Sequence, residues 1–216
     1  MSKDTRDNYT SVAIDWQTAM KITQYKTMFF VGLFVTIAMV TCLPAFFHVI
    51  QIRSGVILHD PIVDSLPAYD LSIPVFLVLW SVISLSVLRA FQSPQQCILT
   101  VYAILFLLTL RYISVSLVAL DPPARLIPLR DPLSNLTYGH KNYITKDLFF
   151  SGHTSSMFIC FLLLNRKPEK IFALCATVAI AIFVLIQHVH YTIDVIAAPF
   201  FTYLAYRLSK KVTQLG

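Results

Sequence analysis

The sequence predicts an all-α integral membrane protein, a bundle of six transmembrane helices, and three observations lead to this fold class. Hydrophobic residues make up 56% of the 216 residues and charged residues 13%, whereas soluble domains average about 45–50% apolar and about 25% charged residues. Six apolar runs approach the roughly 20 residues that a helix needs to cross a bilayer. Lys and Arg residues are also more abundant in alternate connections, as the positive-inside rule describes.

The six apolar runs define one membrane domain between two polar ends. Their ranges are 27–51, 71–88, 94–120, 148–165, 171–187 and 190–208. We expect residues 1–26 to form a cytoplasmic or interfacial segment, because they are polar and show no signal-peptide pattern. Residues 27–208 are expected to form the six-span domain, and residues 209–216 a cytoplasmic tail.

The Lys and Arg residues predict the orientation of the bundle. With six spans, one side carries both termini and the second and fourth connections, and it holds Lys3, Arg6, Lys21, Lys26, Arg89, Arg166, Lys167, Lys170, Arg207, Lys210 and Lys211. The opposite side holds Arg53, Arg125, Arg130, Lys141 and Lys146. The positive-inside rule therefore predicts that both termini are cytoplasmic. The connections 52–70 and 121–147 and the turn at His188 then face the extracytoplasmic or lumenal side.

The net charge and the cysteines exclude several other classes of protein. The charge of +6 is spread over loops rather than gathered in a patch, which favours topology and lipid headgroups over nucleic acid as its cause. The cysteines are Cys42, Cys97, Cys160 and Cys175. They lie in apolar runs and none forms a CxxC pair, so neither a zinc site nor a disulfide framework is predicted.

His190 and Asp194 form the first candidate catalytic pair. They are four residues apart, so on a helix they would stack on one face. A carboxylate beside an imidazole can hold one ring nitrogen as N–H and leave the other free to attack or to accept a proton. An Asp inside an apolar segment is costly without a partner. The alternative is a structural His–Asp pair that closes the end of a helix.

A second candidate group begins the fourth apolar run. Ser151 is a good N-cap, and Gly152 lets a ligand approach the backbone closely. Such a helix start attracts anions. If a phosphate binds there, His153 could protonate the leaving oxygen and Arg111 could balance the negative charge. The alternatives are a capped helix with an interfacial His, and an Arg that snorkels to headgroups.

With the predicted topology, the unusual polar residues of three spans fall on one membrane face. A metal site made by His153, His188, His190 and Asp194 is the less favoured interpretation, because phosphoryl transfer through a phosphohistidine needs no metal. No metal and no cofactor are therefore predicted. His188 lies two residues from His190, so it can reach the site only from a turn.

These residues resemble the lipid phosphatase and phosphotransferase superfamily (PAP2), and within it the sphingomyelin synthase-like branch. Ser151-Gly152-His153-Thr154 and the run from His188 to Val195 carry the most specific likeness. Asp147, the stretch from Arg111 to Pro123, and Leu66-Pro67 with Asp70 add to it, so the resemblance covers roughly residues 66–203. It implies a PAP2-like bundle of six transmembrane helices.

The chain also departs from the family patterns. The phosphatases carry an Arg shortly before the nucleophilic His, but residues 183–186 are all apolar here. This difference favours the synthase-like branch over a phosphatase. Asp121 stands where that branch has a proline, and Thr145-Lys146 stands where it has Cys-Gly.

The resemblance implies a headgroup transferase that acts through a phosphohistidine. His190, oriented by Asp194, would attack the phosphorus of a phospholipid, and His153 would serve as general acid and then base. The residues expected to bind substrate are Arg111, Asp147, Ser151, Gly152, His188 and Tyr191. The alternatives are a lipid phosphate phosphatase, with water as acceptor, and a non-catalytic lipid-binding protein.

The expected partners are a phospholipid donor, a ceramide or diacylglycerol acceptor and the bilayer itself, with no nucleic acid and no prediction of oligomeric state. A choline ammonium could be caged by cation–π contact with aromatic residues near the site. These residues are Tyr138, Tyr143, Phe149, Phe150 and Tyr191. The alternative for each of them is a place in an interfacial aromatic belt.

Overall fold

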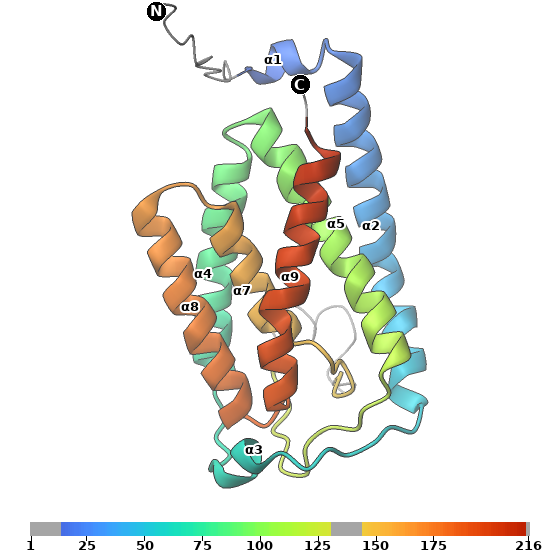
Figure 1. Cartoon of the computed structure of the whole chain (residues 1–216), viewed down its shortest axis with the longest axis vertical. Coiled ribbons are helices and arrows are strands. Elements are labelled where there is room, and N and C mark those ends of the chain that lie inside the picture. The colour runs from blue at the N-terminus through green and yellow to red at the C-terminus, as the bar shows by residue number, and fades with distance from the viewer. Residues whose placement is uncertain (1–13, 131–143, 215–216) are drawn as a thin grey trace, which may run out of the picture.

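The structure is a computed structural model that describes residues 14–130 and 144–214. The described chain is helical, with helices α1 (Trp16–Ala19), α2 (Thr23–Ile52), α3 (Pro61–Ser65), α4 (Ser72–Ala90), α5 (Pro94–Leu117), α7 (Gly152–Leu163), α8 (Lys167–Ile186) and α9 (Thr192–Val212). The long helices run side by side along the bundle, α1 lies across one end and α3 lies at the other (Figure 1). The all-α prediction is confirmed for this part of the chain.

Four of the described helices, α2, α4, α5 and α8, are long and apolar enough to cross a membrane. Each begins and ends within four residues of a predicted span. Helix α7 is apolar but has only 12 residues, and α9 has 21 residues with charged side chains near both of its ends. Several apolar helices fit a multi-pass membrane protein, whereas the count of six spans stays a prediction.

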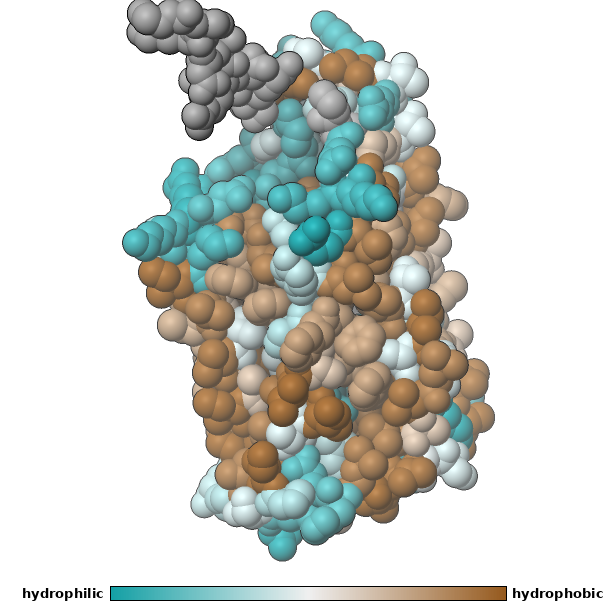
Figure 2. All heavy atoms as spheres, in the orientation of Figure 1, coloured by the Kyte–Doolittle hydropathy of each residue, from teal (hydrophilic) through white to brown (hydrophobic). Residues whose placement is uncertain are grey.

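Hydrophobic side chains cover the middle of the bundle on the outside as well as the inside. Phe34 on α2, Leu117 on α5 and Phe200 on α9 are 73%, 78% and 73% exposed. Figure 2 shows hydrophobic residues over the middle of the visible face and hydrophilic residues at its two ends. In water such a surface would be an aggregation liability. A bilayer is the solvent that this surface fits.

The core lies between α4, α5, α7, α8 and α9, where apolar residues from each helix meet. Val75, Met157 and Ile180 are fully buried in it. Helix α2 packs on the outside, against α5 (Figure 1). Its approach depends on Gly32, since a Cβ there would lie 2.7 Å from Cε2 of Tyr102.

Helix α7 begins inside the bundle rather than at its end. At 1.5 Å per residue its 12 residues extend about 18 Å, against a hydrocarbon core of about 30 Å. The predicted run 148–165 therefore becomes helical only at Gly152, and residues 144–151 approach it without helical structure. Irregular backbone at membrane depth is tolerated only where protein groups satisfy it.

The two ends of the bundle differ in their contents. Helix α1 and the C-terminal end of α9 lie at one end, and α3 and the connection from α8 to α9 lie at the other (Figure 1). At the first end, Nε1 of Trp16 donates a hydrogen bond to the Phe91 carbonyl at 2.9 Å, which ties α1 to the turn between α4 and α5. Which end faces the cytoplasm remains the prediction made from the Lys and Arg residues.

Candidate active site

His190 and Asp194 are paired, but a helix cap brings them together rather than a helix face. Helix α9 begins only at Thr192, with Tyr191 as its N-cap. The prediction that both residues stack on one helix was therefore wrong, because His190 lies before the first turn. Asp194, in that turn, reaches back to accept a hydrogen bond from the Tyr191 N–H at 3.1 Å, and its Oδ2 lies 3.2 Å from Nδ1 of His190.

Asp194 also holds the irregular segment that precedes α7. Its Oδ1 accepts a hydrogen bond from the Phe149 N–H at 3.2 Å, and its backbone carbonyl accepts one from the Ser151 N–H at 3.0 Å. The residue is fully buried, so these bonds offset much of the cost of burying a carboxylate. One side chain thereby positions the starts of α7 and α9 relative to each other.

The carboxylate determines which nitrogen of His190 is available. An ionised Asp only accepts hydrogen bonds, so the proton in the contact with Asp194 belongs to Nδ1 of His190. The other nitrogen, Nε2, then keeps its lone pair. The His190 residue is 2% exposed, and a ring held in this way can act as a nucleophile.

The ring of His153 faces that of His190 from the start of α7. The ring centroids are 6.2 Å apart with an angle of 62° between the planes. Nδ1 of His153 is buried and has no hydrogen-bond partner among the described residues. Phe76, on α4, makes an edge contact with the same ring at 6.2 Å. The two histidines, far apart in sequence, therefore share one site.

Arg111 reaches the site from α5 and is already engaged there. It forms an ion pair with Asp147 and donates a hydrogen bond to the Phe150 carbonyl. The Asp147 and Arg111 side chains are 27% and 12% exposed. A Cβ on Gly152 would lie 3.0 Å from Cζ of Arg111. The close approach that Gly152 allows is thus occupied by the guanidinium in this structure, whereas the sequence predicted a ligand there.

Ser151 caps α7 as its sequence predicted. Its Oγ accepts hydrogen bonds from the N–H of Thr154 at 3.3 Å and from the Thr154 hydroxyl at 3.1 Å. The first turn of a helix presents N–H groups and the positive end of the helix dipole, equivalent to about half a charge. Arg111 adds a positive charge and Asp147 a negative one. The remaining balance favours an anion beside Gly152 and His153.

A cavity of about 490 Å³ opens from this group of polar residues. Arg111, Asp147 and His153 line one part of it, and most of the other lining side chains are apolar residues of α4, α5 and α7. A ligand with a charged head and a long apolar chain matches such a lining.

Two of the predicted substrate-binding residues are engaged elsewhere. Nε2 of His188 lies 3.2 Å from the Leu66 carbonyl, and the residue is buried. The Tyr191 hydroxyl donates to the Asp121 carbonyl at 2.8 Å and accepts from the Leu58 N–H at 3.2 Å. Both side chains hold the connections around α3, and neither is among the described residues that line the cavity. Their contact with substrate stays a prediction.

Three residues of the predicted aromatic cage, Phe149, Phe150 and Tyr191, lie within the described chain, and the cage itself stays a prediction. Tyr138 and Tyr143 lie outside the described residues. The Phe150 ring stacks on Phe201 with centroids 4.6 Å apart, and the Arg111 guanidinium lies 5.3 Å from the Phe150 centroid. Phe150 therefore already contacts a cation of the protein itself.

Asp60 is a residue that sequence reasoning missed. It caps α3, and its Oδ2 and Oδ1 also accept hydrogen bonds from the Thr192 N–H at 2.6 Å and the Thr192 hydroxyl at 3.0 Å. Burial alone would raise the pKa of Asp60, but these hydrogen bonds and those from Val63 and Ile62 outweigh it and lower the pKa. The sequence signal was Asp60-Pro61, a cap followed by a proline, which indicates the start of α3. Nothing near Asp60 in the sequence indicates that it also binds the start of α9.

Gln187 was missed as well. Its Oε1 accepts a hydrogen bond from the Leu71 N–H at 3.1 Å, and its Nε2 donates to the Ser72 hydroxyl at 3.1 Å. The fully buried side chain thus joins the end of α8 to the start of α4. Within the described part of the chain, no three His, Cys, Asp or Glu residues are grouped so as to hold a metal ion.

Comparison with known families points to the same part of the chain. Residues 146–211 match the family model described as PAP2 superfamily C-terminal. That stretch contains α7, α8 and α9, with His153, His190 and Asp194. The match supports membership of the PAP2 superfamily, a group of enzymes that act as lipid phosphatases or phosphotransferases. Searches of curated proteins and of solved structures found no match.

Proposed function

We propose that the protein transfers a phospho-headgroup, such as phosphocholine, from a glycerophospholipid to a lipid alcohol, ceramide or diacylglycerol. The observation that carries this proposal is the pair of facing imidazoles. His190 is held by Asp194 with Nε2 free, and His153 lies 6.2 Å away beside an apolar cavity. The superfamily supports phosphatase or phosphotransferase chemistry in general, and the transfer to a lipid is our own inference.

The reaction has two displacement steps. In the first, Nε2 of His190 attacks the phosphorus, the bond from phosphorus to the glycerol oxygen breaks, and protonated His153 gives its proton to that oxygen. Diacylglycerol leaves, and the headgroup stays on His190 as a phosphohistidine. In the second, His153 takes the proton of the acceptor hydroxyl as its oxygen attacks phosphorus. The bond from nitrogen to phosphorus breaks, and both histidines return to their starting states.

The spacing of the rings supports these roles. A nucleophile in a near-attack geometry lies about 3–3.5 Å from the atom that it attacks. A general acid lies about 2.6–3.2 Å from the atom that it protonates. The ring centroids are 6.2 Å apart, so both imidazoles border one space. A phosphoryl group bound there would meet His190 through its phosphorus and His153 through its leaving oxygen.

The surrounding residues would stabilise the developing charge. Arg111 and the start of α7 supply positive potential where the phosphate oxygens would lie. Asp194 would stabilise the positive charge that His190 acquires as it forms the phosphohistidine. Ser151 would affect the substrate by fixing the start of α7, and Gly152 by leaving room for Arg111. Apolar surroundings exclude water and so favour transfer over hydrolysis.

The proposal includes six spans, with α7 and its preceding segment as the fourth and α9 as the sixth. The termini would then be cytoplasmic and the site would face the extracytoplasmic or lumenal side. A fluorescence-quenching assay on a label at each end of the chain, in sealed vesicles, tests this orientation. Labels that report opposite sides for the two termini would contradict it.

A lipid phosphate phosphatase is the second candidate, because the same residues would serve with water as the acceptor. The test uses purified protein in lipid nanodiscs, supplied first with fluorescent ceramide and phosphatidylcholine, then with phosphatidate or ceramide phosphate. A new phosphosphingolipid supports transfer. Release of inorganic phosphate without lipid transfer supports the phosphatase. If neither product forms, both candidates are contradicted.

A further inference from the structure

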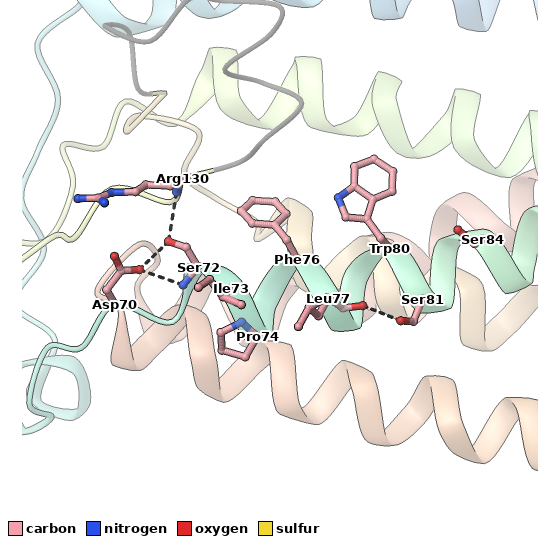
Figure 3. A pocket seen from close by; sticks show the side chains of 10 residues that line it. All are labelled: Asp70, Ser72, Ile73, Pro74, Phe76, Leu77, Trp80, Ser81, Ser84 and Arg130. Carbon is pink, nitrogen blue, oxygen red and sulfur yellow. Dashed lines mark hydrogen bonds between the residues drawn. The ribbon is translucent and has the colours of Figure 1, made fainter.

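A second hollow, of about 770 Å³, lies along α4 on the side that the first cavity does not use. Asp70, Ser72 and Arg130 form its polar end (Figure 3). Ile73 and Leu77 line its apolar stretch, and both are strongly exposed on the outside of the bundle, at 76% and 65%. The result is a groove with a polar head region and an apolar body, open toward the surface that a bilayer would cover.

The groove and the first cavity share one wall. Phe76 and Trp80 line both of them. Phe76 is also the residue that contacts the His153 ring, with centroids 6.2 Å apart. A molecule in the groove is therefore separated from the proposed general acid and base by the wall that Phe76 and Trp80 form. No other described residue lines both spaces.

The length of the groove matches one leaflet of a membrane. It extends from Ser72 to Ser84, a difference of 12 positions on α4. At 1.5 Å per residue this is about 18 Å. Half of a hydrocarbon core of about 30 Å is about 15 Å. A lipid whose head lies at the polar end can thus extend one chain along the groove over about the depth of one leaflet.

The charges at the polar end indicate the class of lipid. Ser72 hydrogen bonds, together with the charge of Arg130, lower the pKa of Asp70, so this residue is ionised and offsets the guanidinium. The polar end of the groove lies at the start of α4, but Asp70 accepts a hydrogen bond from the Ser72 N–H at 3.0 Å, so a carboxylate of the protein already occupies that helix start. In the first cavity Asp147 offsets Arg111, but the start of α7 is capped by the Ser151 hydroxyl rather than by a carboxylate, and that is where a phosphate belongs. A neutral head with hydroxyl groups fits the groove better than a phospholipid head.

We propose that this groove binds the acceptor, a neutral lipid with a free hydroxyl, while the phospholipid donor occupies the cavity beside Arg111. This inference rests on the proposed transfer function and deepens it. The acceptor hydroxyl passes Phe76 to reach His153, which removes its proton in the second step. With two separate lipid sites, the acceptor can already be bound when the phosphohistidine forms. Transfer to the acceptor can then occur before water attacks the phosphohistidine.

The test compares two serine variants that place a large ring on the lipid-facing surface. Ser84→Phe fills the far end of the groove, and Ser116→Phe puts the same ring on an exposed position of α5 that lines neither space. Steady-state transfer to fluorescent ceramide and donor cleavage without acceptor are measured for each. We expect Ser84→Phe to raise the KM for ceramide about tenfold or more and to leave donor cleavage within about twofold. Ser116→Phe should change neither.

A measurement on the unmodified protein makes the test independent of how a variant folds. A photoactivatable diacylglycerol is crosslinked to the wild-type protein in nanodiscs, and the labelled peptide is identified by mass spectrometry. Label on residues 72–84 that excess ceramide displaces supports the proposal. Label confined to α5 and α7, or an unchanged KM for ceramide in Ser84→Phe, would overturn it.

The outcomes also separate this proposal from the proposed function. If the wild-type protein cleaves the donor and transfers its headgroup to no lipid, the transfer function fails and the groove proposal fails with it. If the wild-type protein transfers the headgroup but Ser84→Phe weakens donor cleavage and transfer equally, only the groove proposal fails. That second result would mean that one cavity serves both lipids in turn.

Discussion

The starts of α7 and α9 bring one histidine each to the same site, but they hold them differently. At the start of α9, His190 is paired with Asp194, and the surrounding backbone is bound by Asp194 and Asp60. At the start of α7, Nδ1 of His153 has no partner among the described residues, and the ring lines a cavity. One ring is fixed in direction and the other is left free, as a nucleophile and a proton carrier require.

The largest expected effect comes from removing either ring. His190→Ala and His153→Ala should each abolish headgroup transfer while the protein still elutes as a single species in detergent. The two variants should differ on a donor with an activated leaving group, such as a p-nitrophenyl phosphodiester, because its departure needs no proton. General acid catalysis contributes about 10²–10⁴-fold, so cleavage of that donor by His153→Ala should recover by a comparable factor.

His190→Ala should show no such recovery, since it lacks the nucleophile. Recovery in both variants would contradict the assignment of separate roles. The matched control is His48→Ala, which changes a His on α2 that is not among the residues lining the cavity. Its transfer rate should stay within about twofold of the wild-type rate.

The next effect concerns the residue that links the two helix starts. Asp194→Asn should lower kcat about 10³-fold or more, because the amide no longer enforces the Nδ1–H tautomer of His190. It should also lower the thermal midpoint, since the hydrogen bonds of Phe149 and Tyr191 weaken. The control is Asp64→Asn on α3, whose side chain is 57% exposed and pairs with His59 at 3.1 Å. Equal losses in both variants would contradict the proposed role of Asp194.

A smaller effect is expected at the α7 start from Gly152→Ala. The new methyl group would meet Arg111 at 3.0 Å, so the guanidinium must move away from Asp147 and Phe150. Overpacking of this kind costs about 1–3 kcal/mol. We expect a lower midpoint in thermal unfolding and about tenfold lower kcat/KM for the donor. If kcat/KM is unchanged, the position of Arg111 does not matter for catalysis.

The smallest effect is expected at Asp60, which binds Thr192 at the start of α9 rather than His190 itself. Asp60→Asn should destabilise the protein by about 0.5–2 kcal/mol, the usual cost of losing a cap. The pKa of Asp60 is lowered in the folded protein, so its contribution is present above the unfolded pKa of about 3.9 and is lost as the pH falls through the folded value.

The difference in midpoint between the wild-type protein and Asp60→Asn should therefore be constant from about pH 7 to pH 5 and shrink below about pH 4. Thermal unfolding in detergent, followed by tryptophan fluorescence over this range, measures it. A difference that grows toward acid would contradict the role of the ionised carboxylate. Asp60→Glu keeps the charge and should recover part of the lost stability.

The sequence predicted what depends on neighbours along the chain. The apolar runs predicted α2, α4, α5 and α8 to within four residues, and Ser151 predicted the start of α7. It also predicted that His153 and His190 meet, because the topology placed both at one end of the bundle. Composition and short motifs contain this information, since helix length and caps are local properties.

The rest depends on residues that only the folded chain brings together. Asp60 and Thr192 are 132 positions apart, and Gln187 and Leu71 are 116 positions apart. No pattern along the chain marks such pairs. Arg111 was recognised as a charged group near a phosphate, but its ion pair with Asp147 and its contact with Gly152 appear only when α5 packs against α7.

The shortness of α7 has one consequence for how such an enzyme would meet its membrane. The helix starts well inside the bundle (Figure 1). His153 in its first turn is therefore deeper in the bundle than the ends of the neighbouring helices, and a substrate headgroup would have to move deeper than those of the surrounding lipids to reach it. The distance that the headgroup would have to move depends on bilayer thickness. The thickness of the host membrane would thereby help to select which lipids react.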